Sequence, residues 1–227
     1  MNAIILAGGN SKRFNKVNKA FIKLGDKTLI DIIINRLETL FNKILIIVKD
    51  DEQLHKFTMF TTQNVAVIKD VLPKRSSLSG IYSGLIQSKS YYNFICACDM
   101  PFINTDLVRY MINTVKQGNA DVVIPRLKLE NLPNKGYEVL HSIYSKKCIH
   151  HIERQIKNNN FKIIDFFLYV KVKEIPEEVI KEIDPQLLSF FNINNINDLR
   201  KASRILHKKE DLNYATDTIR YRNSTEY

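Results

Sequence analysis

The chain has 227 residues, of which 44% are hydrophobic, and a formal net charge of +10 at pH 7. This length allows one substantial core, and no apolar run approaches the roughly 20 residues that a membrane-spanning helix needs. Three cysteines are too few for a disulfide framework or a four-ligand zinc site, so we expect reduced thiols and a cytoplasmic location.

The positive charge does not by itself indicate a nucleic-acid partner. The lysines are spread along the chain and form no single arm or stripe. The favoured interpretation is a solvated basic surface that attracts a polyphosphate ligand, with neither nucleic acid nor membrane as a partner. A basic RNA-binding protein is an alternative class, but the aromatic residues fall mostly in apolar runs and not among basic clusters.

The first half of the chain alternates strand-like apolar runs with helical periodicity. The predicted strands are 3–6, 44–48, 65–68, 94–98 and 122–124, the last expected to end at Pro125. The predicted helices are 29–41, a short crossover helix between 48 and 65, and 107–115. This order predicts an α/β fold, a three-layer sandwich with a Rossmann-like, mostly parallel sheet and helices on both faces.

The second half of the chain is less regular. Residues 128–136 form a polar loop, 139–144 and 169–172 are predicted strands, and 146–156 and 196–205 are predicted helices. Asn195 or Asn197 is expected to be the N-cap of the last helix. Residues 1–207 are expected to form a single domain, and the polar residues 208–227 a peripheral C-terminal tail.

Glycine and aspartate follow three predicted strands at their carboxyl ends. Gly8 and Gly9 follow the first strand, Asp70 the third and Asp99 the fourth. In a doubly wound sheet, ligands bind at this edge, where the order of the strands reverses. We therefore expect these residues to lie around one site.

The segment LAGGNSKRFNKVNKAFIKL has residue types that suit a triphosphate. Gly8 and Gly9 allow backbone N–H groups to approach a phosphate, while Arg13 and Lys19 supply cationic donors. The segment is neither a P-loop nor a GxGxxG motif. Taken alone, the glycine pair is better explained as an ordinary turn after a strand.

This segment resembles the signature loop of the molybdenum cofactor guanylyltransferases, and further resemblances follow in the same order. LSGIYSGL at 78–85 resembles the family's PLAGI, ACDMPF at 97–102 its PCDMPF, and HSIY at 141–144 its HALY. DVVIP at 121–125 also matches, and FNINNINDL at 191–199 resembles FNINTPEDL. The ordered set covers nearly the whole chain except its tail.

The resemblance implies a nucleotidyltransferase of the nucleotide-diphospho-sugar transferase fold type. Such an enzyme transfers GMP from GTP to the terminal phosphate of molybdopterin, the pterin of the molybdenum cofactor, and releases pyrophosphate. It implies Mg²⁺ as the metal, with Mn²⁺ as the alternative. The implied partners are GTP and molybdopterin, together with proteins that donate the cofactor and molybdoenzymes that receive it.

The resemblance also assigns roles to particular residues. The implied catalytic residues are Arg13, Lys19 and Asp99, with Asp99 as the metal ligand. The implied nucleotide-binding residues are Leu6, Ala7, Gly8, Gly9, Lys19, Asp70, Ser79, Gly80 and Asp99.

Each assignment has a structural alternative. Asp99 is instead a helix-capping residue, Asp70 pairs with Lys74 or Arg75, and His141 is a structural histidine with its hydrogen bonds satisfied instead of a residue that faces the pterin. Ser76-Ser77 and Asn15 stand where the family usually has Gly-Pro and glycine. Two alternative functions also stay open: a cytidylyltransferase for the same cofactor, although such relatives have LAAG in place of LAGG, and a noncatalytic nucleotide or cofactor carrier.

Overall fold

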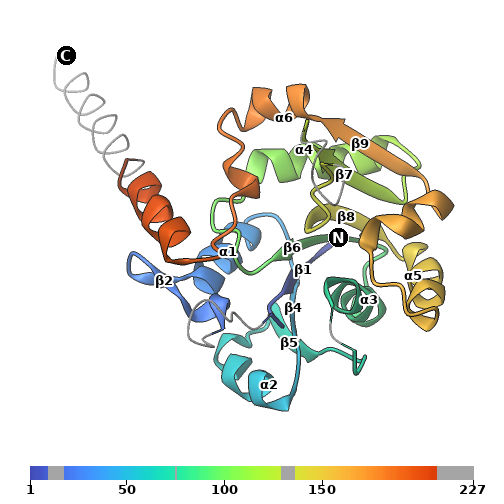
Figure 1. The fold of residues 1–227 in the computed structure, drawn as a ribbon, viewed down its shortest axis with the longest axis horizontal. Coiled ribbons are helices and arrows are strands. Elements are labelled where there is room, and N and C mark those ends of the chain that lie inside the picture. The colour runs from blue at the N-terminus through green and yellow to red at the C-terminus, as the bar shows by residue number, and fades with distance from the viewer. Residues whose placement is uncertain (10–17, 75, 129–135, 209–227) are drawn as a thin grey trace.

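The computed structural model describes residues 1–9, 18–74, 76–128 and 136–208 (Figure 1). Its centre is a seven-stranded sheet in the order β5-β4-β1-β6-β8-β7-β9. All pairings in this sheet are parallel except those of β8, which is antiparallel to β6 and β7. The strands are β1 (Asn2–Leu6), β4 (Ile44–Val48), β5 (Val65–Lys69), β6 (Tyr92–Ala97), β7 (Val122–Arg126), β8 (His141–Ser145) and β9 (Val172–Pro176).

Helices cover both faces of the sheet, which confirms the predicted three-layer α/β fold. They are α1 (Leu29–Leu37), α2 (Asp51–Phe57), α3 (Ser77–Gln87), α4 (Thr105–Gln117), α5 (Cys148–Lys157) and α6 (Glu177–Ile183). Successive side chains of a strand point to opposite faces, so Ile5 packs in the core with α1, α2, α4 and α6, whereas Ile4 packs with α3 and α5. Figure 1 shows α3 and α5 together on one side of the sheet.

The order of the strands reverses at β1. The chain adds β4 and then β5 on one side of β1, and it returns to place β6 on the other side. The carboxyl ends of β1, β4, β5 and β6 therefore meet at one edge of the sheet. A ligand site is expected at this edge, because the loops that follow the strands on either side of β1 diverge and leave a crevice between them.

The last described helix, residues 196–208, packs outside the main sheet. Asn195 is its N-cap, as predicted, because its Oδ1 accepts the N–H groups of Asn197 at 2.9 Å and Asp198 at 3.1 Å. Ala202 joins a separate apolar cluster with Ile22, Leu24, Leu29, Phe102 and Ile193. Leu24 of this cluster belongs to β2 (Lys23–Leu24), which pairs in antiparallel fashion with β3 (Lys27–Thr28). Residues 209–227, nearly all of the predicted tail, lie outside the described residues.

Among the predicted elements that differ from the structure, three are strands. Pro125 does not end its strand: it lies inside β7, where it pairs with Ile175 of β9, while the β7–β8 register reaches only Val123. With no β8 neighbour beyond Val123, the N–H that proline lacks is not needed there. The strand predicted at 169–172 is also displaced, because Ile163–Tyr169 forms a 3₁₀ helix and β9 begins only at Val172.

The third difference is at β8, which begins at His141 and not at residue 139. The N–H of His141 donates to the carbonyl of Glu138 at 2.9 Å, so residues 138–141 form a turn before the strand. Helices α3 and α6 had no predicted counterpart. Helix α6 is only seven residues long and begins directly after β9, so its apolar pattern was too short to recognise.

Candidate active site

A pocket of about 540 Å³ lies at the edge where β1, β4, β5 and β6 end. Gly8 and Gly9 follow β1, Lys49 follows β4, Asp70 follows β5 and Asp99 follows β6. The lining consists of Leu6, Gly8, Gly9, Lys19, Ile47, Val48, Lys49, Asp70, Ser76, Ser77, Gly80, Ala97, Cys98, Asp99, Leu140 and Asn192. The residues that follow these strands therefore lie around one pocket at the carboxyl ends of the strands, where a doubly wound sheet binds its ligands.

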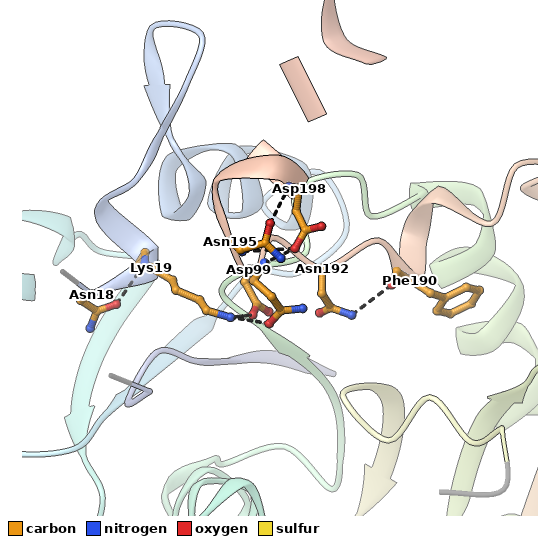
Figure 2. A network of polar contacts seen from close by, with 9 residues as sticks. Asn18, Lys19, Asp99, Phe190, Asn192, Asn195 and Asp198 are labelled. Carbon is orange, nitrogen blue, oxygen red and sulfur yellow. Dashed lines mark hydrogen bonds and ion pairs between the residues drawn. The ribbon is translucent and has the colours of Figure 1, made fainter. Parts of the chain in front are cut away.

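Lys19 and Asp99 meet in this pocket although 80 residues separate them (Figure 2). The Nζ atom of Lys19 lies 2.7 Å from Oδ2 of Asp99, and the two side chains are only 18% and 15% exposed. Partial burial lowers the effective dielectric, so this pair interacts more strongly than a fully exposed one. The site thus places one cation and one anion side by side.

Asn18 explains how Lys19 reaches this position. Its Nδ2 donates to the carbonyl of Ala7 at 3.0 Å, and its Oδ1 accepts the N–H of Ala20 at 3.0 Å. Asn18 is thus the N-cap of the short 3₁₀ helix η1 (Lys19–Phe21) and also ties that turn to the end of β1. The lysine is therefore fixed relative to the glycine pair.

Asp99 does not cap the helix that follows it. The N-cap of α4 is Asn104, whose Oδ1 accepts the N–H groups of Asp106 and Leu107 at 2.9 and 3.3 Å. The carbonyl of Asp99 accepts the N–H of Ile193 at 2.9 Å, and its carboxylate contacts Lys19. The structural alternative for Asp99 is therefore wrong, and its carboxylate stays in the pocket.

The carboxylate of Asp70 accepts hydrogen bonds from its own loop and from α3. Its Oδ1 accepts the N–H of Leu72 at 3.0 Å and the hydroxyl of Ser83 at 2.6 Å. The alternative partner Lys74 lies instead over the ring of Phe161, 4.2 Å from its centroid. The other alternative partner, Arg75, lies outside the described residues.

The two serines that replace the usual Gly-Pro pair have distinct places. Ser76 is the N-cap of α3, where its Oγ accepts the N–H of Ser79 at 3.0 Å, and Ser77 is the first residue of the helix. Both line the pocket. The N-terminus of α3 therefore faces the site, where its unpaired N–H groups and partial positive charge favour an anion or an acceptor atom.

The structure brings together most of the residues predicted from the sequence. Those in the pocket lining are Leu6, Gly8, Gly9, Lys19, Asp70, Gly80 and Asp99. Ala7 and Ser79 are fully buried and do not belong to the lining. The hydroxyl of Ser79 donates to the carbonyl of Lys74 at 2.6 Å, so it supports the loop before α3. Arg13 and Asn15 lie outside the described residues.

Several residues of the site had no predicted role, among them Lys49, Leu140 and two asparagines. Lys49, Leu140 and Asn192 line the pocket, and Oδ1 of Asn194 accepts a hydrogen bond from Lys19 Nζ at 2.7 Å. The FNIN segment was the signal for the two asparagines, since they alternate there with the partly buried Phe191 and the fully buried Ile193. Lys49 had no signal in the sequence, because it is one of many lysines that follow an apolar run.

His141 does not face the pocket, and it is also not the hydrogen-bonded structural histidine of the alternative. It is fully buried between Phe94 and Phe190, with ring centroids 5.1 and 5.2 Å away. Neither ring nitrogen has a hydrogen-bond partner among the described residues. Burial lowers its pKa to about 3, so the imidazole is neutral at physiological pH.

Other ionisable groups near the site are also perturbed by burial. Burial raises the pKa of the Glu138 carboxyl to about 7. It also raises the pKa of the Cys98 thiol, which lines the pocket, so this cysteine is protonated and is not a nucleophile at neutral pH.

Magnesium fits the donor set of the pocket. Among the described residues, no group of three or more His, Cys, Asp and Glu gathers to form an all-protein metal site. Mg²⁺ usually needs only one or two carboxylates, and substrate phosphates and water supply its other ligands. Asp99, with its carboxylate in a pocket beside a lysine, meets this requirement.

Across the same described ranges, no helix has the length and apolar character needed to span a membrane.

Comparisons with known proteins agree with this geometry. The family model of the MobA-like NTP transferase domain matches residues 3–165. A probable molybdenum cofactor guanylyltransferase of Natranaerobius thermophilus is 35% identical over 92% of this chain and 98% of its own length. A molybdenum cofactor guanylyltransferase of Desulfosudis oleivorans is 32% identical over 89% of this chain and 94% of its own length.

Solved structures share the fold. The molybdopterin-guanine dinucleotide biosynthesis protein A of Archaeoglobus fulgidus superposes with a TM-score of 0.79 at 24% identity, over 92% of this chain and all of that one. The 4-diphosphocytidyl-2C-methyl-D-erythritol synthase of Anaerococcus prevotii gives 0.66 at 16% identity, over 91% and 95% of the two chains. With a pocket at the switch point and a family model that spans most of its strands, the chain belongs to the MobA-like NTP transferase family.

Proposed function

We propose that this protein is a molybdenum cofactor guanylyltransferase, which transfers GMP from GTP to the terminal phosphate of molybdopterin. The observation that carries the proposal is the convergence of Lys19 and Asp99 in a pocket at the carboxyl ends of the strands. The similarity to guanylyltransferases over about nine tenths of the chain supports the same conclusion.

The reaction needs no protein nucleophile. An oxygen of the acceptor phosphate attacks the α-phosphorus of GTP, and the bond from that phosphorus to the bridging oxygen breaks. Pyrophosphate leaves with the bonding electron pair. The acceptor oxygen is already anionic, so no general base is required, which agrees with the protonated state of Cys98 and the burial of His141.

The residues of the pocket then have electrostatic and positioning roles. Lys19 neutralises the negative charge that builds on the leaving pyrophosphate, and the backbone around Gly8 and Gly9 admits the triphosphate. Asp99 would hold Mg²⁺, which neutralises phosphate charge when it is bound. Arg13, which follows Gly8 and Gly9 in the sequence, is proposed as a second cation for the triphosphate.

Binding of the base is assigned to the opposite end of the pocket. Guanine presents neighbouring N–H donors on its Watson–Crick edge, which a carboxylate or backbone carbonyls accept. Asp70, Ser76, Ser77 and Gly80 line the pocket, and Asp70 follows β5, three strands along the sheet from β6, which Asp99 follows. Cytosine presents a different donor and acceptor order, so this arrangement favours GTP over CTP.

Side-by-side turnover with the two nucleotides tests the proposal. Purified protein, molybdenum cofactor, MgCl₂ and either GTP or CTP are mixed, and pyrophosphate release is measured together with the dinucleotide product. We expect release that depends on the cofactor and is at least about tenfold faster with GTP. Faster release with CTP would identify a cytidylyltransferase, and no release with either nucleotide would identify a noncatalytic carrier.

A further inference from the structure

A hydrogen-bonded turn at residues 194–198 lies beside the Lys19–Asp99 pair (Figure 2). Asn195 caps the helix at 196–208, as described above. In return, Oδ2 of Asp198 accepts the N–H groups of Asn194 at 2.9 Å and Asn195 at 3.2 Å. This reciprocal pattern is a capping box, extended by one residue to Asn194. We refer to these five residues as the 194–198 turn.

The 194–198 turn and the residue before it contact both members of the ion pair. Oδ1 of Asn194 accepts a hydrogen bond from Lys19 Nζ at 2.7 Å, and the N–H of Ile193 donates to the carbonyl of Asp99 at 2.9 Å. Asp198 is not one of the residues that line the pocket, and within the described part of the chain no hydrogen bond joins it to Lys19. Because it fixes the backbone N–H of Asn194, Asp198 fixes the place where the amide oxygen of Asn194 meets the lysine.

The second acceptor matters because a lysine ammonium has three donors on a long flexible side chain. In the structure two acceptors hold it, one from Asp99 and one from Asn194. A divalent cation on Asp99 would compete with Lys19 for the carboxylate oxygens. Asn194 would then be the neutral acceptor that still holds the ammonium in the pocket.

We propose that Asp198 is a positioning residue that acts through Asn194 to hold the Lys19 ammonium at the triphosphate site. Its consequence for GMP transfer rests on the proposed function. The contact between Asn194 and Lys19 does not, because it is present in the protein without any substrate.

The chain provides a matched control. Thr28 and Asp31 form an equivalent capping box at the start of α1: the N–H of Thr28 donates to Oδ2 of Asp31 at 3.2 Å, and the N–H of Asp31 donates to Oγ1 of Thr28 at 3.3 Å. Asp31→Ala therefore removes the same type of carboxylate from a capping box that makes no hydrogen bond to Lys19. Asp198→Asn is the conservative variant, because it keeps one acceptor oxygen in place.

The test measures how fast an amine-acylating reagent modifies Lys19 in the full chain without nucleotide, with mass spectrometry of the peptide that contains Lys19. We expect Asp198→Ala to speed the modification of Lys19 about fivefold, the effect of losing about one net hydrogen bond. Asp31→Ala should leave the rate at the wild-type value, and Asp198→Asn should restore most of the protection. In an Asn194→Ala background, Asp198→Ala should add no further increase.

Two results would overturn the proposal. One is an unchanged Lys19 modification rate in Asp198→Ala with a melting temperature lowered as much as in Asp31→Ala, since Asp198 would then only stabilise its helix. The other is a further increase in the Asn194→Ala background, which would show an action that bypasses Asn194. In turnover, Asp198→Ala should raise KM for MgGTP severalfold and Asp31→Ala should not. If wild-type protein transferred no GMP, the proposed function would fail, while the modification rates would still decide the role of Asp198.

Discussion

His141 should make the stability of the protein fall steeply in mild acid. The imidazole is buried between two phenylalanine rings without a hydrogen-bond partner in the described structure, and its pKa is lowered from a usual value of 6.5 to about 3. The unfolded chain therefore binds a proton that the folded chain does not, between about pH 6.5 and pH 3. Stability from the neutral imidazole is complete above pH 6.5 and decreases as the pH falls toward 3.

The magnitude follows from linkage. At pH 5, protonation of the unfolded histidine costs the folded state about 2 kcal/mol relative to pH 8. His141→Phe removes this proton while it keeps an aromatic ring between Phe94 and Phe190. The difference in unfolding free energy between the variant and the wild type should therefore change by about 2 kcal/mol, in favour of the variant, from pH 8 to pH 5.

Urea unfolding followed by far-ultraviolet circular dichroism measures this change, and the chain contains no tryptophan for a fluorescence assay. The comparison uses the pH dependence and not the absolute stability, so any overpacking by the larger ring cancels. Parallel curves of unfolding free energy against pH for the two proteins would refute the reasoning. They would mean that the imidazole is hydrated or paired in solution.

Three further predictions concern Glu138 and two glycines of α3. Burial raises the pKa of Glu138 from 4.5 to about 7, so the wild type loses stability as the pH rises from 4.5 through 7. Glu138→Gln should therefore be more stable than the wild type at pH 8, by up to about 3 kcal/mol, and equally stable at pH 4. Urea unfolding that shows no gain in stability at pH 8 would contradict this prediction. Gly84→Ala should destabilise the fold by about 1–3 kcal/mol in thermal unfolding, because the added Cβ would lie 2.6 Å from Cγ2 of Ile4. Gly80→Ala should destabilise the fold less, since the added Cβ would lie 3.1 Å from its nearest neighbour, Cδ2 of Leu6. An equal loss of stability in the two variants would show that the distance from α3 to β1 does not determine the effect.

Local patterns in the sequence predicted much of the fold. Asn195, one of the two N-caps expected for the last helix, does cap the last described helix. This cap follows from side-chain hydrogen bonds to residues two and three positions away, which a sequence displays directly. The apolar runs of β1, β4, β5 and β6 were equally clear, because strands covered on both faces are almost entirely hydrophobic.

Long-range pairing could not be predicted in the same way. The antiparallel direction of β8 and the parallel pairing of β7 with β9 depend on connections whose sequence is irregular. The run through Pro125 was misjudged because the missing N–H matters only where a neighbouring strand needs it. His141 is a further case, since its neighbours Phe94 and Phe190 come from distant parts of the chain.

The candidate site shows the same division. The positions of Gly8, Asp70 and Asp99 after the first, third and fourth predicted strands predicted their common edge, because the carboxyl ends of parallel strands lie together. The contact of Lys19 with Asn194 spans 175 residues and has no local pattern. The roles of Arg13 and of Asp99 as a metal ligand stay predictions.

The most direct test of the account is GMP transfer from GTP by Lys19→Ala and Asp99→Ala, with Lys56→Ala as the control. Lys56 also forms an ion pair, with Glu52 at 2.7 Å, but on the exposed surface of α2. We predict that each site variant folds and loses about a hundredfold or more in turnover, the cost of about 3 kcal/mol in the barrier, while Lys56→Ala keeps the wild-type rate. Near-normal turnover by both Lys19→Ala and Asp99→Ala would contradict the claim that this pair forms the triphosphate site.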